Sequence, residues 1–353
     1  MGTIDTHALR RILCSVEKPG RYAGGEMNAV CKTSAAVRMA ISYPDLYEVG
    51  MSNHGIRILY DRVNRVEEYA CERVFAAAPD FEAALRREGI PLFTLESRLP
   101  LRELDLVGFN LAHELVYTNV LQILDLGGVP LLRGERGDDM PIVVAGGAAA
   151  SNPGPMEDFI DAFFLGDGEE GIVEKLDVIA AGRRQGLSRS AIIEALAGVQ
   201  GVLLPGGKGA VRRVYRSAAP WTVERPVIPS MRITQEKAVV EVTRGCFNLC
   251  KFCHAGYYDL PCRSYDDGLL ADAVIRAVEN TGYSELTLSS LSISDYRGLV
   301  PLLNRVFPWL TRNGVSLSLP SLRVDASTIP IIEFTSDVRK SSLTFAEIGR
   351  AHV

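Results

Sequence analysis

The sequence lacks any run of 18 apolar residues, so none of its 353 residues is expected to lie in a membrane-spanning helix. Its first 17 residues include His7, Arg10 and Arg11 but no apolar core after them, which is unlike a secretory signal peptide. Cysteine is scarce, and its count of seven is odd. Without a secretion signal, we expect reduced thiols or metal ligands rather than disulfides, in a cytoplasmic protein that contacts no membrane.

The sequence also has no large excess of charge of either sign. Lys and Arg together number 38 and Asp and Glu 43, which gives a formal net charge of −5. This balance argues against a protein that holds nucleic acid by bulk charge, although a local basic groove stays open. Apolar residues make up 47%, which is enough for a sizeable core. At about 150 residues per domain, we expect two or three domains rather than a small disulfide-dependent scaffold.

What the sequence does contain is an alternation of short apolar runs with segments of helical spacing. Strands are expected at 37–42, 104–110, 141–145 and 162–165, and helices at 53–63, 81–88, 118–126 and from 171 to about 181. This alternation is typical of an α/β fold with a doubly wound parallel sheet. Ligands of such sheets bind at the carboxyl ends of the strands, so the loops after Ser42, Asn110, Ala145 and Leu165 are the candidates.

A second alternating series follows a segment rich in proline and glycine. Strands are expected at 238–243, 285–290 and 315–319, and helices at 269–280 and 299–311. The predicted division of the chain is an extension at 1–36, a doubly wound domain at 37–200, a linker at 201–237 and a βα series at 238–346.

Three cysteines fall together as C-x3-C-x2-C, at Cys246, Cys250 and Cys253, directly after an expected strand. Thiolates are the ligands that iron–sulfur clusters and zinc prefer, and this spacing lets three sulfurs face one metal centre. A cluster of four irons held by three cysteines would keep one iron open for an outside ligand. Two other interpretations stay open: a structural zinc with Cys262 or His254 as fourth ligand, and a redox pair of Cys250 and Cys253.

This motif, with the aromatic Phe252 before its last cysteine, resembles the radical S-adenosylmethionine (SAM) superfamily. The resemblance implies a barrel of βα units in which the three cysteines hold a [4Fe–4S] cluster. It further implies that SAM chelates the open iron, and that an electron donor such as flavodoxin or ferredoxin drives its cleavage to a 5′-deoxyadenosyl radical.

The same resemblance implies SAM contacts outside the cysteine motif. Phe252 would lie near the adenine, and Ser290 and Ser292 follow the second strand of the series. Arg323 follows the third strand and would pair with the SAM carboxylate, with a plain surface charge as the alternative.

The doubly wound domain before this series resembles the cobalamin-binding domain of one large class of radical SAM enzymes. The family pattern there is D-x-H-x-x-G after the first strand, S-x-L after a middle strand and G-G after a later one. This chain offers Ser52 and His54, then Asn110, then Gly146 and Gly147, so the resemblance implies cobalamin as a further cofactor with these five residues as candidate contacts. The departures at Ser52 and at position 57, an arginine, favour His54 as a helix cap or packed residue over a cobalt ligand.

Four further segments, at 18–22, 43–47, 50–53 and 343–346, resemble an uncharacterised subfamily of radical SAM proteins with a B12-binding domain. A barrel of about six βα units needs roughly 200 residues, and residues 238–353 supply about half of that. We therefore expect a C-terminally truncated fragment with an incomplete barrel, itself inactive, whose residues 347–353 are a non-native tail.

Three further features of the sequence are weaker indicators of function. A formal G-x-G-x-x-G at 166–171 comes late in the sheet and carries two acids that would face a pyrophosphate, which argues against a dinucleotide site. The arginines at 212, 213 and 216 leave RNA open as a substrate beside a small molecule, but such linker arginines are usually solvated. The remaining cysteines, at 14, 31, 71 and 262, are expected to be ordinary buried or surface thiols.

The predicted function is therefore a radical SAM enzyme acting on an unidentified substrate, either by methyl transfer through cobalamin or by hydrogen abstraction alone. The alternative is a zinc-binding scaffold or binding module whose Rossmann-like domain is not catalytic.

Overall fold

The computed structural model describes residues 4–323 and 345–346, and the chain divides into two compact units. The first unit comprises Met1–Tyr215 and Val227–Thr234, and the second comprises Arg216–Pro226 and Gln235–Val353. The segment predicted to be a linker is therefore shared between the units. The prediction of a non-native tail at 347–353 lies outside the described residues.

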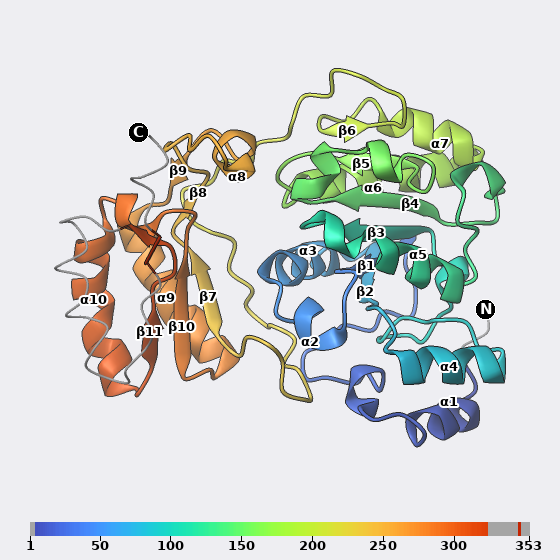
Figure 1. Cartoon of the computed structure of the whole chain (residues 1–353), viewed down its shortest axis with the longest axis horizontal. Coiled ribbons are helices and arrows are strands. Elements are labelled where there is room, and N and C mark those ends of the chain that lie inside the picture. Colours follow the sequence, from blue (N-terminus) through green and yellow to red (C-terminus); the bar gives the residue numbers. More distant parts are fainter. Residues whose placement is uncertain (1–3, 324–344, 347–353) are drawn as a thin grey trace. The chain divides into compact units, whose positions relative to one another are not determined.

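The first unit is built on a six-stranded sheet with the order β2-β1-β3-β4-β5-β6 (Figure 1), in which only β6 runs antiparallel. The strands are β1 (Val37–Ser42), β2 (Tyr69–Arg73), β3 (Leu106–Asn110), β4 (Ile142–Gly146), β5 (Ala162–Phe164) and β6 (Val202–Leu203). Strands β2 and β6 were not expected from the sequence. The chain order reverses between β1 and β3, so this sheet has its topological switch point there.

Helices cover both faces of this sheet, and each face has its own core. The helices of the unit are α1 (Thr6–Leu13), α2 (Tyr47–Gly50), α3 (His54–Asn64), α4 (Pro79–Glu88), α5 (Tyr117–Leu126), α6 (Gly171–Arg184) and α7 (Arg189–Leu196). One core joins α1, α4 and α5 to the sheet, and the other joins α3, α6 and α7 to it. In β1, Met39 and Ile41 belong to the second core and Ala40 to the first, as the two-residue period of a strand requires.

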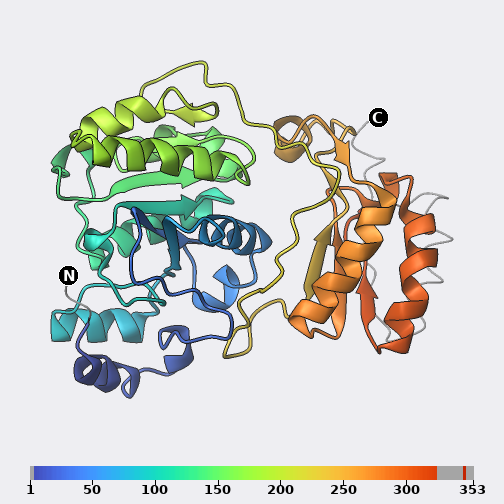
Figure 2. The same cartoon turned by 180° about the vertical axis from the view of Figure 1, so that it is seen from behind.

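The second unit contains a three-stranded parallel sheet with the order β11-β10-β7 and two long helices. Its elements are β7 (Ala238–Glu241), β8 (Thr243–Arg244), α8 (His254–Tyr258), β9 (Arg263–Ser264), α9 (Asp267–Thr281), β10 (Glu285–Ser289), α10 (Leu299–Arg312), β11 (Ser316–Ser318), β12 (Leu322–Arg323) and β13 (Phe345–Ala346). Helices α9 and α10 lie side by side against the sheet (Figure 2) and share one core with it. The predicted α/β class is confirmed in both units.

No helix within the described residues combines the length and the apolar character that a membrane span needs.

A buried lysine gives the first unit a predicted dependence of stability on pH. The Lys175 side chain lies in α6 with 3% of the residue exposed; its Nζ donates to the Gly171 carbonyl oxygen at 3.0 Å and stands 4.6 Å from the centre of the Phe164 ring. Burial disfavours the ammonium ion and lowers the pKa of Lys175 from 10.5 to about 8.

The folded protein therefore binds fewer protons than the unfolded chain between pH 8 and 10.5. Stability should rise with pH across this window by about 3 kcal/mol, because one pKa unit corresponds to about 1.4 kcal/mol. Lys175→Met should remove this rise and stabilise the protein below pH 8. Urea unfolding at several pH values checks it, with the exposed Lys208→Met as control. Equal slopes in Lys175→Met and wild type would contradict the prediction.

Candidate functional site

The three clustered cysteines lie on the loop between β8 and α8 of the second unit. Gly245 opens the loop at φ +82°, and a Cβ there would lie 2.9 Å from the Pro261 carbonyl oxygen, so only glycine lets the loop pass this close to residues 259–262. The Cys253 amide donates to the Cys250 carbonyl oxygen at 2.9 Å. Cys250 is buried, whereas Cys246 and Cys253 are partly exposed.

The donor chemistry of this loop fits an iron–sulfur cluster. All three cysteines are free thiols, and three sulfurs within eight residues form a soft donor set. Within the described residues, however, no group of three or more His, Cys, Asp or Glu side chains is arranged to hold a metal ion. The ligand roles of the cysteines therefore stay a prediction. Metal binding commonly completes such a site, because ligands gather as the metal binds.

Cys262 lies near the same loop. Burial raises the pKa of the Cys262 thiol. Arg244 of β8 pairs with Arg263 of β9, and a Cβ on Gly245 would lie 3.1 Å from Cys262 Cα, so Cys262 lies beside the start of the cysteine loop.

A polar network joins the cysteine loop to the segments that follow β10 and β11 of the parallel sheet. Asp295 stands at its centre, at the end of a short 3-10 helix (Ile293–Asp295). One carboxylate oxygen accepts from Arg323 Nη1 at 2.9 Å. The other accepts from Asn248 Nδ2 and from Ser292 Oγ, each at 2.6 Å. Asn248 Nδ2 also donates to Cys246 Sγ at 3.3 Å.

The structure thus brings three predicted SAM contacts near the predicted cluster ligands. Ser292 and Arg323 meet on Asp295, and Ser290 supports the same turn, since its Oγ accepts from the Ser292 amide at 3.1 Å and lies 2.6 Å from Thr243 Oγ1. Phe252 stands apart from this network with 71% of its surface exposed. The contacts of these four residues with SAM stay a prediction. Arg323 is not a plain surface charge, because it is ion-paired with Asp295.

Asp295 and Asn248 were missed by sequence reasoning. The two residues are 47 positions apart; Asn248 occupies one of the variable positions of the cysteine motif, and Asp295 belongs to no motif. The available signal was their place in the chain. Asn248 comes after β7 and β8, and Asp295 comes after β10; β7 and β10 are neighbouring parallel strands, and the loops after such strands meet at the carboxyl edge.

In the first unit, the predicted cobalamin contacts meet partly at the switch point of the sheet. Asn110 ends β3, and its Nδ2 donates to Asn53 Oδ1 at 3.4 Å. Asn53 is the N-cap of α3, because its Oδ1 also accepts from the Ile56 amide at 3.0 Å. Beside Asn110, Ser42 ends β1 with its hydroxyl fully buried and without a hydrogen-bond partner among the described residues. A buried hydroxyl with no partner is the kind of group that a ligand can satisfy.

Other predicted cobalamin contacts have roles within the protein itself. His54 is the first residue of α3, next to its cap, and Ser52 Oγ donates to the Glu48 carbonyl oxygen at 2.6 Å. Gly147 has φ +97°, and a Cβ there would lie 2.6 Å from the Leu111 carbonyl oxygen. Close packing of the protein's own loop is therefore enough to require glycine at 147, without the approach of a ligand.

Tyr43 and His113 form a further pair at this edge that sequence reasoning missed. They follow β1 and β3, and Tyr43 Oη lies 3.4 Å from His113 Nε2. Tyr43 is 7% exposed while His113 is exposed, so the pair places an imidazole ring at the carboxyl edge of the sheet beside the switch point.

The glycine-rich turn at 166–171 is bound by the protein's own arginines. Arg213 Nη2 contacts the carboxylates of Glu170 at 3.1 Å and Glu174 at 2.7 Å. Arg212 lies 3.6 Å from Asp167. The expectation that these linker arginines are solvated is therefore wrong for Arg212 and Arg213, which neutralise the acids of this turn.

Residues 55–205 match the family model of radical SAM proteins, N-terminal. Over 297 residues, the chain is 26% identical to the uncharacterized protein MJ0966 of Methanocaldococcus jannaschii, a match that covers 81% of this chain and 55% of that protein. The chain thus spans about half the length of the curated relative it matches.

Two solved structures of TsrM from Kitasatospora setae are similar in fold, each with a TM-score of 0.55 over 84% of this chain. The identities are 14% and 13%, and the matches cover 57% and 59% of the TsrM chains. TsrM is a radical S-adenosylmethionine methyltransferase; one structure holds tryptophan substrate with a SAM analogue, the other cobalamin and a [4Fe–4S] cluster. This likeness shows the fold, and it confirms the predicted order of a Rossmann-like sheet followed by a second parallel βα series.

Proposed function

We propose that this chain is a radical SAM protein in which Cys246, Cys250 and Cys253 hold a [4Fe–4S] cluster whose open iron takes SAM. The observation that carries the proposal is the network from Cys246 through Asn248 and Asp295 to Arg323. It joins a three-thiol loop to a cation suited to a carboxylate, at one edge of a parallel sheet. The family match over residues 55–205 supports the same function from the other unit.

We further propose that the first unit takes cobalamin at its switch point. The unpartnered hydroxyl of Ser42 and the Asn53–Asn110 pair supply polar groups there. His54 is not needed as a cobalt ligand, because cobalamin can be held by its corrin and its nucleotide tail. The similarity in fold to TsrM supports this cofactor, and methyl transfer is the reaction that the two cofactors together would serve.

The remaining partners follow from this chemistry. An external one-electron donor of the flavodoxin or ferredoxin kind would reduce the cluster. RNA gains no support as substrate, since two of the three linker arginines pair with acids of their own unit. A small molecule is therefore the substrate class that we propose.

Anaerobic reconstitution with iron and sulfide tests the cluster. The purified chain should turn brown, hold about four irons per chain and give an EPR signal after reduction with dithionite. SAM should alter that signal by binding the open iron. A colourless protein that holds one zinc would overturn the proposal and favour the second candidate, a zinc-binding scaffold, for which the position of Cys262 beside the cysteine loop is the supporting observation.

Cobalamin binding is tested separately on the same preparation. Cobalamin added to the protein should remain with it through gel filtration. Ser42→Val and Asn110→Leu remove the hydroxyl and the amide at the switch point, and both should weaken retention. The exposed Asn313→Leu of the second unit serves as control. Equal retention in all four proteins would contradict binding at this edge.

A further inference from the structure

The side chain of Asn248 uses its hydrogen-bonding groups in three directions. Its Nδ2 donates to Asp295 Oδ2 at 2.6 Å and to Cys246 Sγ at 3.3 Å, and its Oδ1 accepts from Arg323 Nη1 at 3.3 Å. Sulfur is a larger acceptor than oxygen, so 3.3 Å is a close contact for an N–H donor. Each group of the amide therefore faces a partner of the matching kind.

The charges around Asn248 fix which way its amide points. A reversed amide would set Oδ1 against the Asp295 carboxylate and Nδ2 against the Arg323 guanidinium, and both contacts would be repulsive. Asp295 and Arg323 are themselves ion-paired at 2.9 Å, so the two charged partners hold each other in place. The Asp295–Arg323 ion pair therefore fixes the orientation of the amide, and this orientation directs the second N–H of Asn248 at Cys246.

We propose that Asn248 is a positioning residue for the cluster, which fixes the Cys246 sulfur and sets the cluster's reduction potential through an N–H donor oriented by Asp295 and Arg323. This inference rests on the proposed function, since it takes Cys246 as a cluster ligand. Hydrogen bonds to ligand sulfurs are among the factors that set the potential of an iron–sulfur cluster. A hydrogen-bond donor draws electron density from the sulfur and stabilises the reduced cluster, which carries more negative charge. The donor therefore makes the reduction potential less negative.

The position of Asn248 makes such tuning useful for this chemistry. The same Asp295 carboxylate that orients Asn248 also binds Arg323, the proposed partner of the SAM carboxylate. Arg323 also donates directly to Asn248 Oδ1, so a change at Arg323 when SAM arrives is two hydrogen bonds away from the Cys246 sulfur. The network offers a direct physical route by which substrate binding could alter the ease of cluster reduction.

The test is the midpoint potential of the reconstituted cluster in Asn248→Leu, measured by an EPR-monitored redox titration without SAM. Leucine has the same branched arrangement of heavy atoms as asparagine but no hydrogen-bond donor. The potential should become more negative, corresponding to a change of up to about tenfold in the reduction equilibrium, which is about 59 mV for one electron. Asn248→Ala is the second variant, and its shift should have the same sign.

The sign separates this role from mere loosening of the loop. A loosened loop would admit water, which stabilises the more highly charged reduced cluster, and the potential would become less negative. Asn313→Leu, at the exposed end of α10, is the matched control and should leave the potential unchanged. A variant that melts like the wild type but assembles no cluster would also support positioning of Cys246.

Two results would overturn the inference: an unchanged potential in both Asn248 variants, or a shift to a less negative value. A wild-type protein that assembles no cluster would instead overturn the proposed function, which distinguishes the two failures.

Discussion

Replacing any one of Cys246, Cys250 and Cys253 by alanine should leave the reconstituted protein with almost no cluster. Two thiolates cannot hold four irons against chelation by the buffer, so iron should fall from about four per chain to well below one. The broad visible absorption and the EPR signal should disappear with it. Any reductive cleavage of SAM that the wild type shows should fall at least about a hundredfold, because the electron reaches SAM only through the cluster.

The other cysteines provide matched controls for this experiment. Cys14 and Cys31 are exposed thiols of the first unit, and their alanine variants should keep full iron content. Cys262→Ala is the informative control, because Cys262 lies beside the start of the cysteine loop. It should keep the iron of a cluster held by three thiolates, whereas it would lose a zinc held by four ligands. Retention of iron in any of the three motif variants would contradict the ligand assignment.

Among the longer strands, those that could be predicted from sequence are the ones composed mainly of apolar residues. The run at 37–42 is apolar at every position but two and is observed as β1 with these same bounds. Strand β2 was missed because it ends in Glu72 and Arg73, which break an apolar run. All five of its residues are nevertheless buried, because these charges have partners from elsewhere in the chain. Local sequence does not reveal a charge that tertiary contacts neutralise.

The residues of the candidate site also differ in whether local sequence reveals them. The cysteine motif is local, so its spacing was readable directly. The contacts of Asp295 form only when the loop after β10 meets the loop after β8. No neighbouring residue in the sequence indicates that Asp295 belongs to the site. Gly147 is the opposite case: it belongs to a recognisable Gly-Gly motif, but the structure explains this glycine without a ligand. Its positive φ and its contact with Leu111 explain the glycine through the protein's own packing.

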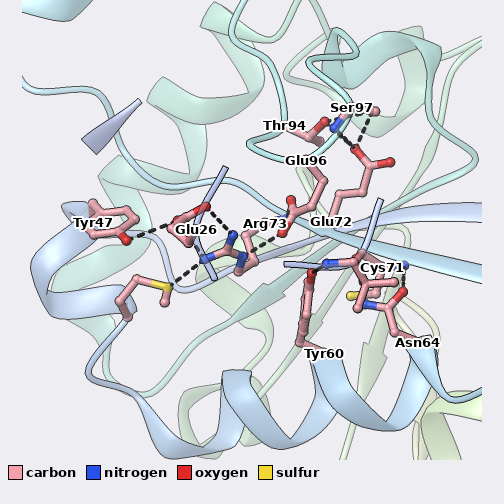
Figure 3. Close-up of polar contacts among 12 residues, drawn as sticks. Glu26, Tyr47, Tyr60, Asn64, Cys71, Glu72, Arg73, Thr94, Glu96 and Ser97 are labelled. Atoms are coloured by element: carbon pink, nitrogen blue, oxygen red, sulfur yellow. Dashed lines mark hydrogen bonds and ion pairs between the residues drawn. The ribbon is translucent and has the colours of Figure 1, made fainter. Parts of the chain in front are cut away.

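Arg73→Ala should cost about 3–5 kcal/mol of folding free energy, because it leaves buried carboxylates without their counter-ion. Arg73 ends β2 with 2% of its side chain exposed, and Figure 3 shows it between Glu26 and Glu96. Its guanidinium donates to Glu26 at 2.9 and 3.0 Å and to Glu96 at 2.7 Å, and the side chains of both acids are almost completely buried. Tyr47 Oη also donates to Glu26 at 3.0 Å.

The wild-type ionisation of this cluster depends on Arg73. Burial alone would raise the pKa of Glu26, but the charge and hydrogen bonds of Arg73 outweigh it and hold that pKa below its usual value. Burial raises the pKa of Glu96 despite the same arginine. Glu26 therefore stabilises the fold above its unfolded pKa, and this contribution is lost as pH falls through the lower, folded pKa.

Without Arg73, both carboxyl groups should have pKa values above their unfolded values. Each then destabilises the fold as pH rises through its folded pKa, so the deficit of Arg73→Ala should be larger at pH 8 than at pH 5. Urea unfolding at the two pH values measures it. The control is Arg86→Ala, which breaks exposed pairs with Glu82 and Asp125 and should cost less than about 1 kcal/mol at either pH. A deficit for Arg73→Ala as small as that of the control, or one that does not grow with pH, would show that the buried acids are not held ionised by Arg73.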